Sequence, residues 1–282
     1  MPMPTPFNIL FTDLDGTLLD QATYSFEPAR PAIHPLQELG IPIIFCTSKT
    51  FLETVELQKI LGISDPFIVE NGGAIYFQPD QIDATGQKTT RCGTWQRLSL
   101  GVPYRDLVAR LVAIQQQTGI AIRSFSFMNV GEIATDCGLS MEDADRAKQR
   151  EFDEPFRLED DNPNDLAQIG KLVQDAGLTL SAGGRYHHIS GGSEKGNAVR
   201  LLCNLLEKTR GPLRSLGIGD SPNDLSMLEA VDLPVVVMRP GGVHHPSLVE
   251  RPTKAIRAFG VGPEGWNAAI LGLLLGEIHH GT

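Results

Sequence analysis

The sequence predicts an α/β fold, with a Rossmann-like parallel-sheet core and an inserted α+β cap domain. Short apolar runs alternate with amphipathic segments of helical spacing over residues 1–80 and again over residues 191–282, a pattern typical of a parallel sheet covered by helices. Over residues 81–190 the helical and strand-like segments do not alternate in this way. We therefore expect a discontinuous core made of residues 1–80 and 191–282, and a cap made of residues 81–190.

Composition limits the classes of partner. The 282 residues are enough for two modules, and 34 acidic against 24 basic side chains give a net charge of -10. Such an acidic balance argues against nucleic acid or an anionic membrane as the main partner. No basic leader or long apolar run is present, so we expect neither a signal peptide nor a membrane span. The four scattered cysteines fit reduced thiols in a cytoplasmic protein.

The first predicted strand covers residues 8–12 and ends at two carboxylates. Asp13 and Asp15 follow this apolar run, and Gly16 breaks it. In an open α/β sheet, ligands bind beyond the carboxyl ends of the strands, so acids at this place face a site. Taken alone, the stretch is equally compatible with a solvated Asp-Gly turn.

The next elements continue the alternation of helix and strand. On the helix expected at residues 51–61, the apolar spacing places Leu52, Val55, Leu57 and Ile60 on one side. The predicted elements of this part, in order, are a helix at 28–39, a strand at 41–46, the helix at 51–61, and strands at 67–69 and 74–77.

Hydroxyl side chains lie between the strand at 41–46 and the following helix. The hydroxyls belong to Thr47 and Ser48, and the cationic Lys49 follows them. Free backbone N–H groups and the positive end of a helix gather there, which suits a phosphate group, and a hydroxyl adds another donor. An ordinary helix cap explains the same residues equally well.

The middle of the chain predicts the cap. Residues 79–94 are polar and contain glycine, which indicates a loop. Ser140 and Asp143 form a capping-box pattern that opens a helix. The other elements expected here are a helix at 104–117, a strand at 120–127, a strand at 152–158, a helix at 165–176, and a hairpin at 179–190 that turns at Gly183 and Gly184.

The last part of the chain returns to the alternating pattern, with a helix at 196–208, a strand at 213–218, a helix at 223–230 and a strand at 234–238. Lys195 opens the first helix, and Asp220 and Asp224 follow the first strand. Parallel strands place their carboxyl ends on one edge, so these residues should meet Asp13, Asp15 and Thr47 there. Each of them alone also fits a solvated cation or a turn.

Carboxylates crowded together repel one another unless a cation lies among them. Mg²⁺ is the expected ion, because it binds carboxylate oxygens together with phosphate oxygens and water. Such a site handles phosphate monoesters. Asp13 is then the nucleophile that becomes phosphorylated, Lys195 neutralises phosphoryl oxygens, Thr47 donates a hydrogen bond, and Asp15 serves as acid and base.

These four motifs resemble the haloacid dehalogenase (HAD) superfamily of phosphatases. The matching stretches are D-L-D-G-T from Asp13, Thr47 after its strand, E-K-G around Lys195, and G-D-S-P-N-D from Gly219 to Asp224. The resemblance implies that Asp13 is the nucleophile and Asp15 the acid and base. It also implies Mg²⁺ held by Asp13, by the backbone carbonyl of Asp15 and by Asp220, with Asp224 as a supporting carboxylate.

A narrower resemblance is to the mannosyl-3-phosphoglycerate phosphatases. It rests on CTSKT (46–50), FIVENGGAIY (67–76), AKQREFDEPF (147–156) and GGRYHHISGGSEKGNAV (183–199). This resemblance implies a sugar joined to 3-phosphoglycerate as the substrate and the osmolyte mannosylglycerate as the product. Glucosyl-3-phosphoglycerate or sucrose phosphate is the alternative substrate, and a phosphomutase or a non-catalytic binding protein is the alternative class. Asp153 departs from the pattern, where a small hydroxyl residue is expected.

The expected ligand carries a phosphate, a carboxylate and several hydroxyls. Arg150, Arg185 and His187 of the cap are candidates for its carboxylate and sugar, because arginine offers a planar fork to a carboxylate. The alternatives are that Arg150 pairs with Glu151 or Glu154 and that His187 only fills a strand face. Further candidates for substrate contact are Ser48, Lys49 and Asn71. We expect a monomer or homodimer acting on a small sugar phosphate.

Overall fold

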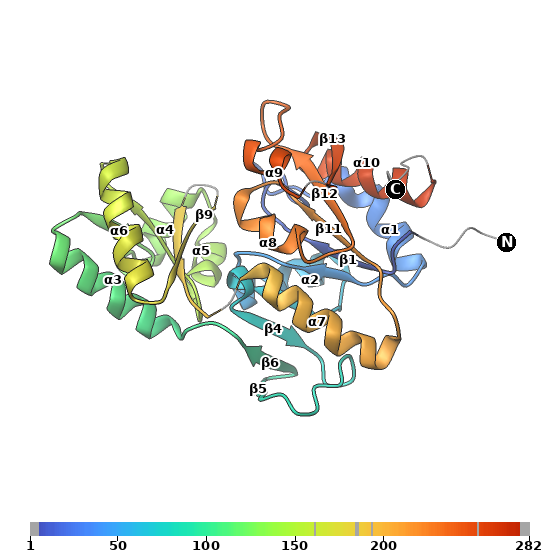
Figure 1. Ribbon diagram of the computed structural model, residues 1–282, viewed down its shortest axis with the longest axis horizontal. Helices are drawn as coiled ribbons and strands as arrows, with labels where there is room; N and C mark the ends of the chain where they lie inside the picture. The colour runs from blue at the N-terminus through green and yellow to red at the C-terminus, as the bar shows by residue number, and fades with distance from the viewer. Residues whose placement is uncertain (1–5, 161, 184–185, 193, 253, 277–282) are drawn as a thin grey trace.

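A computed structural model describes residues 6–160, 162–183, 186–192, 194–252 and 254–276. The chain forms two lobes joined side by side (Figure 1). One lobe carries the core sheet with helices α1, α7 and α10, and the other carries helices α3 to α6 with a separate small sheet. Within the described residues, no helix has the length and apolar character needed to cross a membrane.

The core sheet has five parallel strands in the order β13-β12-β11-β1-β2. Side chains of the central strand β1 alternate between the two faces: Leu10 packs into one hydrophobic cluster, and Ile9 and Phe11 pack into the other. Both faces are therefore buried, as expected for a parallel sheet. The strands are β1 (Ile9–Thr12), β2 (Ile43–Phe45), β11 (Ser215–Gly219), β12 (Leu233–Met238) and β13 (Ile256–Val261).

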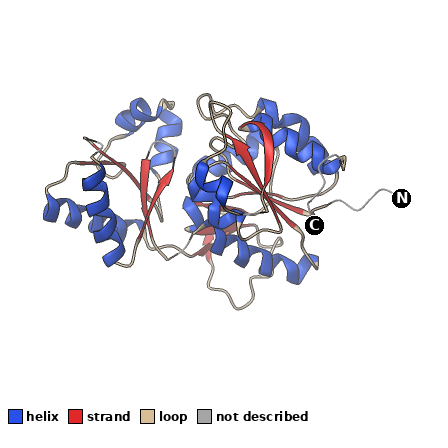
Figure 2. Ribbon diagram, turned by 45° about the horizontal axis from the view of Figure 1, so that its top comes forward, coloured by secondary structure: helices blue, strands red, loops and turns tan. Residues whose placement is uncertain are grey.

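Helices cover both faces of this sheet (Figure 2). Helices α1 (Arg30–Glu38) and α10 (Pro263–Leu274) bury their apolar sides in the cluster that contains Leu10. Helices α7 (Lys195–Arg210) and α8 (Leu225–Leu228) pack in the cluster on the opposite face. The fold class predicted from the alternating pattern is confirmed. The remaining short core elements are η1 (Glu27–Ala29), η2 (Glu70–Gly72), η3 (Pro222–Asp224) and α9 (Pro246–Glu250).

Helix α2 (Phe51–Leu61) has the predicted bounds, and two of the four apolar residues predicted to share one side, Val55 and Leu57, pack against the core cluster. Leu52 is 41% exposed and Ile60 57% exposed, whereas Thr54 and Gln58 are buried. The polar side chains can be buried because local backbone carbonyls satisfy them: Thr54 Oγ1 donates to Thr50 O at 2.8 Å, and Gln58 Nε2 donates to Asp65 O at 2.8 Å. Apolar spacing alone therefore does not identify every residue that this helix buries.

A second, antiparallel sheet adjoins the core and has the order β3-β4-β6-β5. A parallel bridge between Cys46 and Ile68 links it to the end of β2. The loop predicted at 79–94 is wrong in part, because β5 lies within it, and β6 was not predicted. Both strands are short and largely polar, and their local sequence carries little strand signal. They form through pairing, β6 with β4 and β5 with β6. The strands are β3 (Phe67–Val69), β4 (Ala74–Phe77), β5 (Thr90–Cys92) and β6 (Trp95–Ser99).

The other lobe is an antiparallel sheet, β7-β8-β10-β9, packed with four helices. Strands β9 and β10 form the predicted hairpin, and its expected turn residue Gly184 lies outside the described residues. Helix α4 was not predicted, although Asn129 and Glu132 form a capping box at its start. The elements are α3 (Tyr104–Thr118), β7 (Ile122–Ser124), α4 (Val130–Cys137), α5 (Met141–Lys148), β8 (Glu154–Leu158), α6 (Pro163–Asp175), β9 (Thr179–Gly183) and β10 (Tyr186–Ser190).

Candidate functional site

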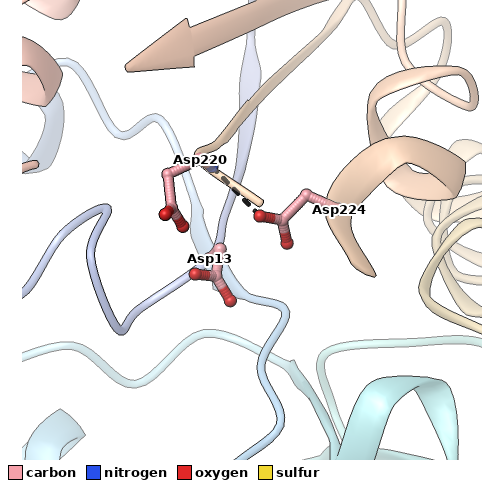
Figure 3. Close-up of side chains that lie close together, drawn as sticks. All are labelled: Asp13, Asp220 and Asp224. Atoms are coloured by element: carbon pink, nitrogen blue, oxygen red, sulfur yellow. Dashed lines mark hydrogen bonds between the residues drawn. The ribbon is translucent and has the colours of Figure 1, made fainter. Parts of the chain in front are cut away.

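Three buried carboxylates meet at the carboxyl ends of β1 and β11 (Figure 3). Asp13 follows β1, Asp220 follows β11, and Asp224 ends the short η3 turn. One oxygen from each lies within 4.8 Å of the others. The two strands are neighbours, and Asp13 N donates to Ile218 O at 2.9 Å, which places the first carboxylate beside the second. The expected convergence of these distant residues is confirmed.

The turn after β11 fixes the position of Asp224. The Oδ2 atom of Asp224 accepts hydrogen bonds from the backbone N of Asp220 at 3.0 Å and of Ser221 at 3.1 Å. A Cβ at Gly219 would lie 2.6 Å from the Asp224 Cβ, so only glycine lets this turn close so tightly. On the other side, Thr17 Oγ1 donates to Asp220 Oδ1 at 3.2 Å.

Lys195 supplies a positive charge to this cluster. It is the first residue of α7 and is 1% exposed, and its Nζ lies 2.6 Å from Asp13 Oδ1 and 2.7 Å from Asp224 Oδ1. Burial alone would lower the pKa of Lys195, but Asp13 and Asp224 hold that pKa above its ordinary value. Lys195 therefore stays charged.

Burial raises the pKa values of two of these acids, Asp13 and Asp220. Burial, together with the charge of Asp224, raises the pKa of Asp13 to about 7 against the opposing effect of Lys195. Burial and the charges of Asp224 and Asp13 raise the pKa of Asp220 to about 8. Three oxygen ligands with excess negative charge form a donor set that suits a hard divalent cation such as Mg²⁺. The residues present therefore fit the expected metal.

Asp15 does not join this group. Its Oδ1 lies 2.8 Å from Lys49 Nζ, and its side chain is 28% exposed. Burial would lower the pKa of Lys49, but Asp15 and Glu53 raise it above the ordinary value. A carboxylate that lies three residues past the strand end, and remains accessible, is suited to exchanging protons with a ligand.

A cavity opens from the carboxylates toward the second lobe. Its core side includes Asp13, Asp15, Lys49 and Asp220, and Ser48 also lines it. The wall contributed by the second lobe includes Phe125, Leu139, Arg150, Tyr186 and His188. The cavity is thus polar and charged where phosphate chemistry is expected, and mixed aromatic, apolar and cationic where the rest of a ligand would lie.

The other predicted residues lie as follows. Thr47 is fully buried, and its Oγ1 accepts from Lys49 N at 3.1 Å. Asn71 and Lys195 both line a second cavity. His187 is on the opposite face of β10 from the cavity-lining His188, with its ring centroid 5.6 Å from that of Phe156. Arg185 lies outside the described residues.

Arg150 has partners other than those considered from the sequence. Its Nη1 donates to Ser48 O at 2.8 Å and approaches Asp153 Oδ1 at 3.3 Å. Glu151 bonds instead to Arg97 and Tyr76. The guanidinium of Arg150 therefore reaches from the second lobe to the strand-end loop that carries Ser48.

Arg239 and His188 are among the cavity residues that were not predicted from the sequence. Arg239 follows β12, and its Nε lies 3.5 Å from Asp220 Oδ2, so the strand-end rule could have identified it. His188 could not have been preferred over His187, because alternation along a strand puts neighbours on opposite faces without saying which face is the cavity.

A parallel α/β sheet with buried carboxylates and a lysine at its strand ends is an arrangement suited to an enzyme that acts on phosphoryl groups. A family model described as haloacid dehalogenase-like hydrolase matches residues 10–91 and 131–239. The chain therefore belongs to the haloacid dehalogenase-like hydrolases. It is an enzyme, a phosphoric monoester hydrolase.

Two curated relatives resemble the chain over nearly its whole length. A protein of Methanococcoides burtonii is 42% identical over 95% of this chain and 97% of its own length. One of Persephonella marina is 35% identical over 97% of this chain and 99% of its own length. Both are named glucosyl-3-phosphoglycerate/mannosyl-3-phosphoglycerate phosphatase.

Solved structures share the fold at low sequence identity. A Thermoplasma acidophilum protein superposes with a TM-score of 0.67 at 18% identity, covering 95% of this chain and 99% of its own. The sucrose-phosphatase of a Synechocystis species, solved with sucrose and phosphate, gives 0.60 at 17% identity, covering 94% and 97%. These likenesses support the two-lobe architecture.

Proposed function

We propose that the protein is a Mg²⁺-dependent phosphatase that hydrolyses a glycosyl-3-phosphoglycerate, with mannosyl-3-phosphoglycerate as the first candidate and the glucosyl compound as the alternative. The observation that carries this proposal is the cluster of Asp13, Lys195, Asp220 and Asp224 at the base of a cavity between the lobes. The names of the two curated relatives support the choice of substrate.

Asp13 is the proposed nucleophile. Its carboxylate attacks phosphorus, forming an aspartyl phosphate as the ester P–O bond to the substrate breaks. Lys195, 2.6 Å from Asp13 Oδ1, is placed to neutralise charge on the transferring phosphoryl group. The hydroxyl of Thr47 accepts a bond from Lys49 N and keeps its own hydrogen for a phosphate oxygen.

Asp15 is the proposed acid and base. It gives a proton to the oxygen of the departing substrate, which leaves as an alcohol. It then takes a proton from the water that attacks the aspartyl phosphate, so that inorganic phosphate is released and Asp13 is regenerated. The salt bridge to Lys49 Nζ at 2.8 Å supports a fixed position for this carboxyl group.

Mg²⁺ would be held by Asp13, Asp220 and the backbone carbonyl of Asp15, with Asp224 close by. When bound, the ion would neutralise charge on phosphoryl oxygens and orient the phosphate. The grouping of three buried acids supports this assignment.

The cap would recognise the rest of the substrate. Arg150 lines the cavity and is a candidate for the glycerate carboxylate, and Ser48 and Lys49 are candidates for contacts nearer the phosphate. Arg185 and Asn71 remain further candidates, whereas His187 lies on the face of β10 that is turned away from the cavity. We also propose that the enzyme acts in the cytoplasm, in osmolyte biosynthesis, as a monomer or homodimer.

The test compares phosphate release from mannosyl-3-phosphoglycerate, glucosyl-3-phosphoglycerate and sucrose phosphate, each with Mg²⁺ and with a chelator. We expect the two phosphoglycerate compounds to exceed sucrose phosphate in kcat/KM, and the chelator to remove activity. A preference for sucrose phosphate would contradict the proposed substrate class. A requirement for a sugar bisphosphate, with no inorganic phosphate released, would replace the hydrolase with a phosphomutase.

A further inference from the structure

Asp153 is a fully buried carboxylate just before β8 in the second lobe. Three side chains converge on it. Asp153 Oδ1 lies 2.7 Å from His188 Nδ1 and 3.3 Å from Arg150 Nη1, and Asp153 Oδ2 accepts from Asn71 Nδ2 at 2.9 Å. None of these contacts takes part in the phosphoryl chemistry proposed above, so the group needs an explanation of its own.

Two of the three partners line the cavity. His188 and Arg150 are both cavity residues, and their side chains are only 8% and 7% exposed. Arg150 Nη1 also donates to Ser48 O at 2.8 Å on the core side. Asp153 therefore holds the two side chains that form the nitrogen-rich part of the wall facing the phosphate site, without lining the cavity itself.

The third partner belongs to the core. Asn71 lies in η2, where it adopts a φ of +56°. Its neighbour Glu70 accepts hydrogen bonds from the backbone N of Glu151 at 3.0 Å and of Phe152 at 2.7 Å. The core loop thus binds the backbone of consecutive residues of the second lobe. The next residue, Asp153, contacts the core through Asn71 and the cavity wall through Arg150 and His188.

The chain of contacts continues to the carboxylate cluster. Asn71 Oδ1 lies 3.4 Å from Asn223 Nδ2, and Asn223 adjoins Asp224 and lines the cavity. We therefore expect a displacement of Asp153 to shift both the cationic wall of the cavity and the turn that carries Asp224.

The charge state of Asp153 determines which ring nitrogen of His188 can meet a ligand. Burial would raise the pKa of Asp153, but His188, Arg150 and Asn71 together hold it below its ordinary value. An ionised carboxylate only accepts hydrogen bonds, so the His188 Nδ1 atom carries the hydrogen. The other ring nitrogen, Nε2, is then the atom of His188 left to meet a ligand.

We propose that Asp153 is a positioning residue that fixes Arg150 and His188 against the cavity and joins them to Asn71 of the core, and that it thereby sets recognition of the anionic, carboxylate-bearing part of the substrate beyond the phosphate. The inference rests on the proposed function for the identity of that part. It does not rest on it for the arrangement of the four side chains.

The kinetic test uses Asp153→Asn, which keeps the size of the side chain and removes its charge. In the full-length protein with Mg²⁺, kcat/KM is measured for the preferred glycosyl-3-phosphoglycerate and for para-nitrophenyl phosphate, which has no carboxylate. We expect the loss on the first substrate to exceed the loss on the second by about tenfold or more, mainly through KM. Glu154→Gln is the matched control, because Glu154 is equally buried but accepts from Ser126 N instead.

Equal losses on both substrates, or no loss on either, would overturn the proposal. So would a control variant that loses the same discrimination. A wild-type protein that hydrolyses para-nitrophenyl phosphate but no glycosyl-3-phosphoglycerate would defeat the proposed function. In that case the NMR signature of the His188 ring still tests the arrangement around Asp153.

That measurement is the ¹⁵N NMR signature of the His188 ring at a pH where the ring is neutral, with Asp153→Ala as the second variant. We expect the wild type to hold the hydrogen on Nδ1 and the Ala variant to shift toward the tautomer with hydrogen on Nε2. An unchanged tautomer in a folded Ala variant would show that Asp153 does not orient His188. Folding is checked by circular dichroism.

Discussion

Asp13 has neighbours that give it a role different from that of the other acids. It follows the central strand β1 and bonds Lys195, and burial raises its pKa to about 7. Asp13→Asn removes the nucleophilic oxygen and the charge while keeping the shape. We expect phosphate release to fall by at least about 10³-fold, with the far-ultraviolet circular dichroism unchanged. Retained activity would rule out Asp13 as nucleophile.

Asp65→Asn is the control for that change. Asp65 is a half-buried acid in the loop before β3, and its Oδ2 accepts from Ile43 N at 2.8 Å at the start of β2, the end of that core strand opposite the site. Its replacement makes the same chemical change in the same sheet, so we expect activity within about threefold of the wild type. A comparable loss there would mean that the sheet, and not the nucleophile, was damaged.

Glu70 predicts a pH dependence of stability. Burial raises its pKa to about 8, although Arg150 and backbone N–H groups oppose the shift. An acid whose pKa is raised by folding stabilises the folded state below its unfolded value of 4.5, and loses that contribution as the pH rises through about 8. Glu70→Gln stays neutral, so the variant should lose less stability between pH 5 and 9.

The measurement is Tm from pH 5 to pH 9 for the wild type and Glu70→Gln. We expect the difference in Tm to move in favour of Gln by at least roughly 2–4 °C as the pH rises, the shift that about 1 kcal/mol produces in a domain of this size. Glu38→Gln changes an exposed glutamate and should follow the wild-type curve. Parallel curves for all three proteins would contradict the assignment.

Individual residues differ in how far sequence could place them. Asp13 and Asp220 were predictable because apolar runs mark strand ends, and parallel strands bring those ends together. The partners of Arg150 were not, since Ser48 and Asp153 reach it only through contact between the lobes. Asp153 stood out in the sequence as a departure from a family pattern, yet nothing there indicated that three side chains surround it.

The turn between β11 and η3 is the element that orders the carboxylates. Its geometry needs Gly219, because an added Cβ would lie 2.6–2.7 Å from atoms of the Asp224 side chain. Gly219→Ala should push Asp224 away from its hydrogen bonds to Asp220 N and Ser221 N. We expect a stability loss of about 1–3 kcal/mol, typical of overpacking, and a larger proportional loss of activity.

Urea unfolding and phosphate release measure the two effects of Gly219→Ala. Since Asp224 also bonds Lys195, the variant should need more Mg²⁺ for half-maximal activity than the wild type. Wild-type stability and wild-type Mg²⁺ dependence would show that the turn tolerates a side chain, and would contradict the tight packing described here.

Elements were predictable where their local signal was strong. Helix α2 has its predicted bounds because Thr50 caps its start through Glu53 and Gly62 ends it in a left-handed conformation. Two of its apolar residues, Leu52 and Ile60, stay exposed, whereas hydrogen bonds allow the polar Thr54 and Gln58 to be buried. Strands β5 and β6 have little local signal and exist through their partners.

At the scale of the whole molecule, the boundary between core and cap is a proposal. The ranges 1–80, 81–190 and 191–282 follow the change in sequence pattern. Strand β6 pairs with β4, which in turn adjoins the core through β3, and this pairing supports a first boundary nearer Gly101 than residue 80. A return to the core near Gly191 agrees with the end of β10.

The last prediction concerns Mg²⁺ and the stability of the whole chain. Burial raises the pKa of Asp13 to about 7 and of Asp220 to about 8, so without a cation both acids destabilise the folded state increasingly as the pH rises through those values. A metal needs them ionised, and it binds the folded state because only folding brings them together. Stabilisation by Mg²⁺ should therefore grow with pH.

At a fixed Mg²⁺ concentration of about 100 times the dissociation constant at pH 8.5, we expect a stabilisation of about 2.7 kcal/mol at that pH. The same concentration should stabilise the protein by clearly less at pH 6. The measurement is Tm with Mg²⁺ and with a chelator at both pH values. Asp220→Asn should reduce the rise in Tm with Mg²⁺ at both pH values. The variant lacks one ligand, and it also lacks one of the acids that must lose a proton when the metal binds. A gain that is equal at pH 6 and pH 8.5 would mean that the cation binds elsewhere on this acidic chain.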